Sequence, residues 1–127
     1  MAGVIVLDAS ALIAHLNADD AQHDRAVERM IELAEHPLGC SSITLAEVFV
    51  GPARAGRLAD AERVVRELGV TEIRLGEGTA PRLAELRAQT GLKLPDCCVL
   101  LAAQDSGAHA VLTLDERLSR EASQLGF

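Results

Sequence analysis

The chain has 127 residues, 49% of them apolar, and a formal net charge of −7 at pH 7. This length supports one hydrophobic core and is short for two, so we expect a single domain over residues 1–127. The charge argues against a protein that holds nucleic acid on a broad basic surface. Apolar runs far shorter than the ~18 residues of a membrane span, with no signal leader at the start, predict a cytoplasmic protein with no membrane contact.

The cysteines and aromatic residues narrow the possible sites further. Cys40, Cys97 and Cys98 lack the C-x2-C spacing of a zinc site or redox pair, so we expect buried thiols and no zinc. Phe49 and Phe127 are the only aromatic residues. Stacking platforms for unpaired bases are therefore almost absent, and any RNA would be recognised by its shape and backbone.

The first half of the chain alternates short apolar runs with helical patterns. A buried strand is predicted at 4–7, with a helix from Ser10, and a surface helix at 20–35 has 27, 30, 31 and 34 on its inner face. A second strand is predicted at 37–42, and it leads to a helix capped by Thr44. Gly51 and Pro52 interrupt the pattern of this helix. Another helix is predicted at 61–68.

The second half continues the alternation. Residues 70–75 alternate in polarity as a strand near a sheet edge does, and a turn at 76–79 leads into a helix. Residues 97–104 predict a helix buried on most sides, followed by a strand at 110–114, a helix at 116–124 and the stub of a strand at 125–127. This order predicts an α/β fold, a three-layer α/β/α sandwich with a mainly parallel central sheet of four or five strands.

Four acidic residues each lie where an apolar run meets the start of a helix: Asp8, Glu47, Asp96 and Asp115. In parallel sheets the ligand crevice lies beyond the carboxyl ends of the strands, where Asp8 and Asp115 are predicted. Two carboxylates ~4 Å apart repel each other by about 4 kcal/mol at an effective dielectric near 20, so a cluster needs cations. Mg²⁺ or Mn²⁺ would offset this repulsion and activate a water.

Each acid also has a purely structural interpretation. Asp8 and Asp115 can cap the helices that follow them, and Asp96 suits the positive end of a helix dipole. T44-L-A-E47 matches a capping box, which taken alone favours capping for Glu47. No single position decides the matter, and the set of four favours a metal site.

The segments VLDASAL at 6–12, TLAEV at 44–48, LPDCCVLLAA at 94–103 and LTLD at 112–115 resemble those of the PIN-domain ribonucleases. The closest resemblance is to the VapC toxins of bacterial toxin-antitoxin pairs, and it covers essentially the whole chain in order and spacing. It implies a PIN-like fold and a metal-dependent endoribonuclease that hydrolyses RNA phosphodiester bonds. It also implies a homodimer inhibited by a cognate VapB-type antitoxin.

The resemblance assigns roles to particular residues. Asp8, Glu47, Asp96 and Asp115 would be the catalytic, metal-binding set, with Ser10 and Thr113 as supporting hydroxyls. Arg82, Arg87 and Lys93 are weaker candidates for phosphate contacts, since such side chains are more often solvated charges on a helix face. One departure is that many relatives carry a further acid after the T-x-D segment, where this chain has Arg117, Leu118 and Ser119, which puts a second metal site in doubt.

Two other classes of function stay open. A PIN-like module that binds RNA or a protein without cutting is compatible with the −7 charge. A phosphoacceptor signalling domain shares a parallel sheet and an acidic magnesium pocket, but it needs a lysine after a late strand. The only lysine here is Lys93, which precedes the Asp96 helix.

Overall fold

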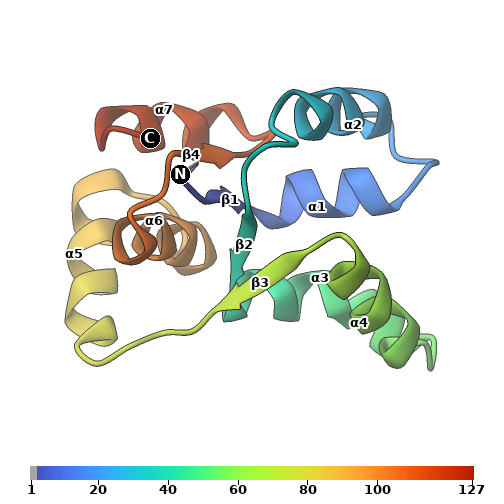
Figure 1. Ribbon diagram of the computed structural model, residues 1–127. Coiled ribbons are helices and arrows are strands. Elements are labelled where there is room, and N and C mark those ends of the chain that lie inside the picture. Colours follow the sequence, from blue (N-terminus) through green and yellow to red (C-terminus); the bar gives the residue numbers. More distant parts are fainter. Residues whose placement is uncertain (1–2) are drawn as a thin grey trace.

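A computed structural model describes residues 3–127, which form a four-stranded, entirely parallel sheet with helices on both faces (Figure 1). The strand order is β3-β2-β1-β4. The elements are, in chain order, β1 (Ile5–Leu7), α1 (Ala9–Leu16), α2 (His23–Glu32), β2 (Leu38–Ser41), α3 (Ser42–Arg54), α4 (Leu58–Glu67), β3 (Val70–Ile73), α5 (Thr79–Thr90), α6 (Leu94–Ser106), β4 (Ala110–Leu112) and α7 (Glu116–Gln124). The predicted three-layer α/β/α class is confirmed.

The alternation of side chains along β1 divides the core into two clusters. Ile5 and Leu7 pack with residues of α1, α3 and α4, whereas Val6 packs with residues of α5, α6 and α7. Successive strand residues point to opposite faces, so a fully apolar strand such as β1 must be covered by helices on both sides. The two helical layers provide that cover, and α2 packs outside α1.

Helix α6 is the most buried helix of the fold, as the sequence predicts. Every residue from Cys97 to Ala103 is at most 3% exposed. The helix packs against α3 and α5 and against β1, β2 and β4. The first turn of this buried helix carries Asp96.

The helix predicted at 20–35 is shorter than expected, and its inner face is different. The observed α2 ends at Glu32, with Ala26 fully buried and Ile31 69% exposed. Met30 and Leu33 pack against the core cluster on this side. The apolar residues of α2 form two adjacent stripes. The stripe that contains the small Ala26 packs against α1, and Ile31 in the other stripe stays exposed.

The start and end of α3 also differ from the prediction. Ser41, at the end of β2, is the N-cap and accepts a hydrogen bond from the Thr44 N–H at 3.1 Å, so the prediction of Thr44 as the cap was wrong. The helix continues through Gly51 and Pro52 to Arg54. Pro52 lies near the carboxyl end, where the missing N–H costs one backbone hydrogen bond.

The strand predicted at 125–127 is not present. The N–H of Phe127 donates to the Ala122 carbonyl at 2.9 Å, which closes the end of α7 as a turn. The sheet described for residues 3–127 thus has four strands. None of the helices within this range is long and apolar enough to cross a bilayer.

Candidate functional site

The carboxylate of Asp8 lies at the centre of a hydrogen-bond network where β1 and β4 end. Its side chain accepts from the Ala11 N–H at 3.0 Å, from the Ser10 hydroxyl at 2.8 Å and from the Thr113 hydroxyl at 2.5 Å. The residue is 4% exposed and caps α1. The capping interpretation is therefore correct for Asp8, and the contact with Thr113 adds a link that capping does not require.

The same hydroxyls hold the loop after β4. The Leu114 N–H donates to Ser10 Oγ at 3.1 Å, and the Asp115 N–H donates to Thr113 Oγ1 at 3.0 Å. Pairing of β1 with β4 extends to Leu7 and Leu112, and the Asp8 N–H then donates to the Leu112 carbonyl at 3.2 Å. Asp8 and Thr113 meet because the parallel register brings the two strand ends together.

Asp115 is exposed and caps α7. Its carboxylate accepts from the Arg117 N–H at 2.9 Å and from the Leu118 N–H at 3.0 Å. A single oxygen, Oδ1, accepts both bonds. The second oxygen accepts no hydrogen bond from the described residues and remains free to bind a ligand.

Glu47 and Asp96 approach the site from two helices that pack against each other, α3 and α6. The capping box predicted for Glu47 is absent, since the cap of α3 is Ser41 and Glu47 lies in the second turn. Asp96 lies in the first turn of α6, next to Pro95. Neither carboxylate accepts a hydrogen bond from the residues that the structure describes.

The pKa values of Asp8, Glu47 and Asp96 are raised, and the charges of neighbouring acids contribute to each shift. Burial raises the pKa of Asp8, and the charge of Asp115 raises it further, against the lowering effect of the hydrogen bonds from Thr113, Ala11 and Ser10. Burial and then the charges of Asp96 and Asp8 raise the pKa of Glu47.

Asp96 follows the same pattern. Burial raises its pKa first, and the charges of Asp115 and Asp8 add to the shift. The charge of Asp8 also contributes, after burial, to raising the pKa of the Cys40 thiol to about 12. Charge from at least one of the other three acids thus contributes to the raised pKa of Asp8, Glu47 and Asp96.

These carboxylates fit a hard, hydrated cation better than a closed metal cage. Within residues 3–127, no three His, Cys, Asp or Glu side chains are close enough to form a ready metal-ligand group. Mg²⁺ usually keeps several waters and binds through one or two carboxylates, and Mn²⁺ also suits carboxylate and water oxygens. The donor chemistry therefore fits either ion, with water supplying part of its shell.

A family model for the PIN domain matches residues 5–123 of the chain, the range that contains all four acids. The chain belongs to the PIN domain family. The membership that the sequence motifs predicted is thus confirmed. No curated protein is similar enough in sequence to be matched to the chain.

Solved structures share the fold of this PIN domain. A toxin-antitoxin complex from Klebsiella pneumoniae has 24% identity and a TM-score of 0.69, covering 91% of this chain and 90% of that one. VapC20 of Mycobacterium tuberculosis, described as a sarcin-ricin loop cleaving toxin, has 19% identity and a TM-score of 0.67, with 97% and 95% covered. FitAcB of Neisseria gonorrhoeae has 19% identity and a TM-score of 0.68, with 94% and 93% covered.

The basic residues that the sequence suggested as phosphate contacts lie in different places on the PIN domain. Lys93 is the N-cap residue of α6, and its charge lowers the pKa of Asp96. Arg87 donates to the Leu92 carbonyl at 3.0 Å, which holds the turn before α6. Arg82 forms an ion pair with Asp105 at 2.6 Å near the carboxyl end of α6. It is therefore out of reach of the acid group, the set of four carboxylates from Asp8, Glu47, Asp96 and Asp115.

Arg117 is a site residue that the sequence interpretation did not select. Its charge lowers the pKa of Asp96, and its guanidinium donates to the Thr90 carbonyl at 3.4 Å. The sequence marked this position only as the place where relatives carry another acid. The signal that could have identified it is its position two residues after Asp115, on the first turn of α7.

Proposed function

We propose that this PIN-domain protein is an endoribonuclease that requires Mg²⁺ or Mn²⁺ and acts as the toxin of a VapC-type toxin-antitoxin pair. The observation that carries the proposal is the joining of Asp8 to the loop of Asp115 through Ser10 and Thr113 where β1 and β4 end, with charge from the other acids contributing to the raised pKa of Asp8, Glu47 and Asp96. Such a group of acids is costly in an isolated protein and useful in one that binds cations. PIN-family membership supports the proposal, as do the structural neighbours described as a toxin-antitoxin complex and as a sarcin-ricin loop cleaving toxin.

Asp8 and Asp96 would hold the principal ion, and Glu47 would bind it directly or through a water. Asp115 would complete the site with its free oxygen. A bound divalent cation supplies a water of lowered pKa and neutralises charge on the phosphate. Attack in line with the leaving oxygen would produce 5′-phosphate and 3′-hydroxyl ends.

The protein's own residues would fix and assist this chemistry. Ser10 and Thr113 hold the Asp8 carboxylate in one orientation. Glu47 is exposed, so its carboxylate can exchange protons with solvent. It can therefore accept a proton from the attacking water and release it to solvent.

Cleavage of a structured RNA by the purified protein, with Mg²⁺ or Mn²⁺, tests the proposal. EDTA or Asp96→Asn should abolish cutting while circular dichroism stays unchanged, and the control Glu62→Gln on α4 should cut at the wild-type rate. Equal cutting by Asp96→Asn would point to a contaminating nuclease. Failure of the wild-type protein to cut any structured RNA, together with metal-independent RNA binding, would favour the non-cutting module instead.

The toxin role has its own test. Expression in a bacterial cytoplasm should arrest growth, and Asp96→Asn should relieve the arrest. Coexpression with the protein encoded immediately upstream should also relieve it if that protein is the VapB-type antitoxin. Light scattering on the purified PIN-domain protein would show whether it forms the homodimer that the family resemblance implies.

A further inference from the structure

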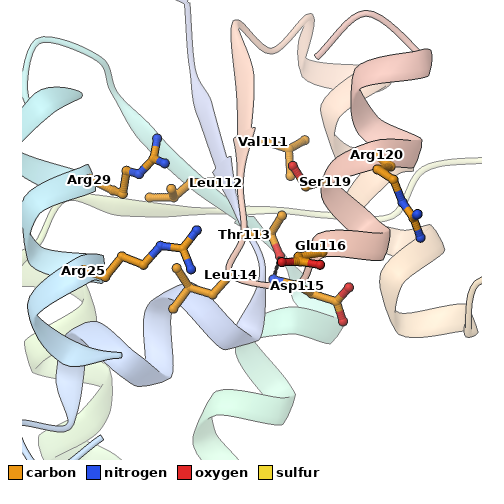
Figure 2. A pocket seen from close by; sticks show the side chains of 10 residues that line it. All are labelled: Arg25, Arg29, Val111, Leu112, Thr113, Leu114, Asp115, Glu116, Ser119 and Arg120. Carbon is orange, nitrogen blue, oxygen red and sulfur yellow. Dashed lines mark hydrogen bonds between the residues drawn. The ribbon is translucent and has the colours of Figure 1, made fainter. Parts of the chain in front are cut away.

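A basic pocket opens beside the acid group, between α2 and α7 (Figure 2). Its volume is about 400 Å³. Arg25 and Arg29 of α2 form one wall, Arg120 of α7 lies on the other side, and the loop through Thr113 and Asp115 lies between them.

The three arginines of this pocket are not used for ion pairs. Within residues 3–127, the ion pairs of arginine involve Arg57, Arg63 and Arg82, none of which lines the pocket. Arg25 and Arg29 are four residues apart, so they lie on the same face of α2 and repel each other. Asp115 and Glu116 also line the pocket, between the arginines of α2 and Arg120, but no ion pair joins them to these arginines within residues 3–127. Three arginines against two acids leave a net positive charge, which suits an anion supplied by another molecule.

The floor of the pocket leads directly into the acid group. Thr113 lines the pocket and donates to Asp8, while Asp115 lines the pocket and raises the pKa of both Asp8 and Asp96. The loop through Thr113 and Asp115 thus lies between the arginine side chains of the pocket and the carboxylates of the acid group. A chain of phosphates held by the arginines would pass over the carboxylates.

The chemistry of the lining suits a sugar-phosphate backbone more than bases. Guanidinium groups bind phosphate oxygens in a bidentate geometry. The only aromatic residues of the chain, Phe49 and Phe127, do not line the pocket. Stacking therefore cannot supply the affinity, and charge and hydrogen bonding must.

We propose that the pocket formed by Arg25, Arg29 and Arg120 binds the phosphates of the RNA strand next to the bond that is cut. This inference rests on the proposed nuclease function and names the residues that grip its substrate. It differs from the earlier candidates Arg82 and Arg87, which make contacts within the protein.

The test compares two triple variants of equal charge. The pocket variant carries Arg25→Gln, Arg29→Gln and Arg120→Gln, and the control variant carries Arg54→Gln, Arg66→Gln and Arg74→Gln, which change exposed arginines on α3, α4 and just after β3. Both are made on an Asp96→Asn background so that RNA stays intact. Fluorescence anisotropy with a labelled single-stranded RNA then gives affinity in Mg²⁺ over a range of salt.

The logarithm of the binding constant falls linearly with the logarithm of the salt concentration, and each lost phosphate contact should make this slope shallower by about 0.7. The slope of the pocket variant should therefore be shallower than that of the parent by about 2. Between 50 and 200 mM salt, the parent should accordingly lose about 20-fold more affinity than the pocket variant does. The control variant should keep the parent's slope. Thermal unfolding checks that both triple variants fold.

Binding of the pocket variant at the parent's affinity and salt slope would overturn the proposal, and so would a parent that binds no RNA. Polyglutamate is the competing probe, because an acidic protein segment could also occupy a basic pocket. If polyglutamate binds through the three arginines and RNA does not, the pocket is a protein site and the proposal is wrong.

Failure of the proposed function has a different signature. A protein with wild-type Asp96 that binds RNA through the pocket and never cuts it would keep the pocket as a site for RNA phosphates and remove the nuclease function. A protein that cuts RNA equally well with and without the three arginines would remove only the pocket proposal.

Discussion

The hydroxyl of Thr113 donates a hydrogen bond to the carboxylate of Asp8 and joins the ends of β4 and β1, residues 105 positions apart in the chain. The bond measures 2.5 Å, and the Asp8 side chain is buried. A buried carboxylate needs such donors, because burial without them strongly favours the neutral form. Thr113 therefore both holds the strand ends together and favours the ionised form of Asp8 against the effect of burial.

Replacement of Thr113 with Val should destabilise the protein by about 1–3 kcal/mol, because Asp8 would lose a buried donor. The pKa of Asp8 should rise further, since the hydrogen bond from Thr113 lowers it in the wild type. Urea unfolding measures the first effect. Thr113→Ser keeps the hydroxyl and should stay close to wild type, and equal loss in both variants would show that the methyl group matters instead.

In the absence of metal, the contribution of Asp8, Glu47 and Asp96 to stability should fall as pH rises above about 4. The pKa values of Asp8, Glu47 and Asp96 are raised in the folded protein. Between the ordinary carboxyl pKa near 4 and these raised values, the folded state binds more protons than the unfolded state, so stability decreases with pH in that window. Glu47→Gln should be more stable than wild type at neutral pH by a few tenths of a kcal/mol.

This advantage of Glu47→Gln should shrink as pH falls toward 4, where the wild-type carboxylate becomes protonated. Urea unfolding in EDTA at several pH values measures it, and the matched control Glu62→Gln should show no such pH-dependent gain. Added Mg²⁺ should stabilise the wild type more than Glu47→Gln. A Glu47→Gln variant that is less stable at every pH would contradict the proposed repulsion.

Much of the fold could be predicted because its strongest signals are local. The helix after Asp115 was predicted with its observed bounds, since Asp115 caps it and α7 has a clear polar face. The buried helix after Asp96 was recognised from a run of apolar residues without a polar face. Helix α2, by contrast, has two neighbouring apolar stripes, one with Val27 and Ile31 and the other with Ala26 and Met30. The sequence does not show which stripe is buried, because packing against α1 decides it.

The candidate site could be predicted only in part, because its geometry depends on tertiary packing. The sequence identifies each acid by its place before a helix, and family membership supports the set. The influence of Asp96 on Glu47 comes from the packing of α6 against α3, which no local pattern encodes. The position of Arg117 beside Asp96 likewise depends on how α7 lies against the turn at Thr90.

Arg117→Gln should bind Mn²⁺ more tightly than wild type, by roughly two- to fivefold, because a positive charge near Asp96 opposes a cation. Calorimetric titration above neutral pH, with all carboxylates ionised, gives the affinity. Arg66→Gln on α4 removes the same charge from a remote position and should leave the affinity unchanged. Weaker Mn²⁺ binding by Arg117→Gln would show that Arg117 positions the site instead of opposing the ion.

Asp115 has two roles that substitution can separate, since it caps α7 and also contributes charge to the acid group. Asn caps helices about as well as Asp, so the free energy of unfolding of Asp115→Asn should lie within about 0.5 kcal/mol of the wild-type value. That of Asp115→Ala should be lower by about 1 kcal/mol. Both variants should lose RNA cleavage, because neither provides the negatively charged oxygen. Glu116→Gln, next in the chain, should keep both stability and cleavage. Wild-type cleavage by Asp115→Asn would assign Asp115 to capping alone and leave the metal to the three other carboxylates.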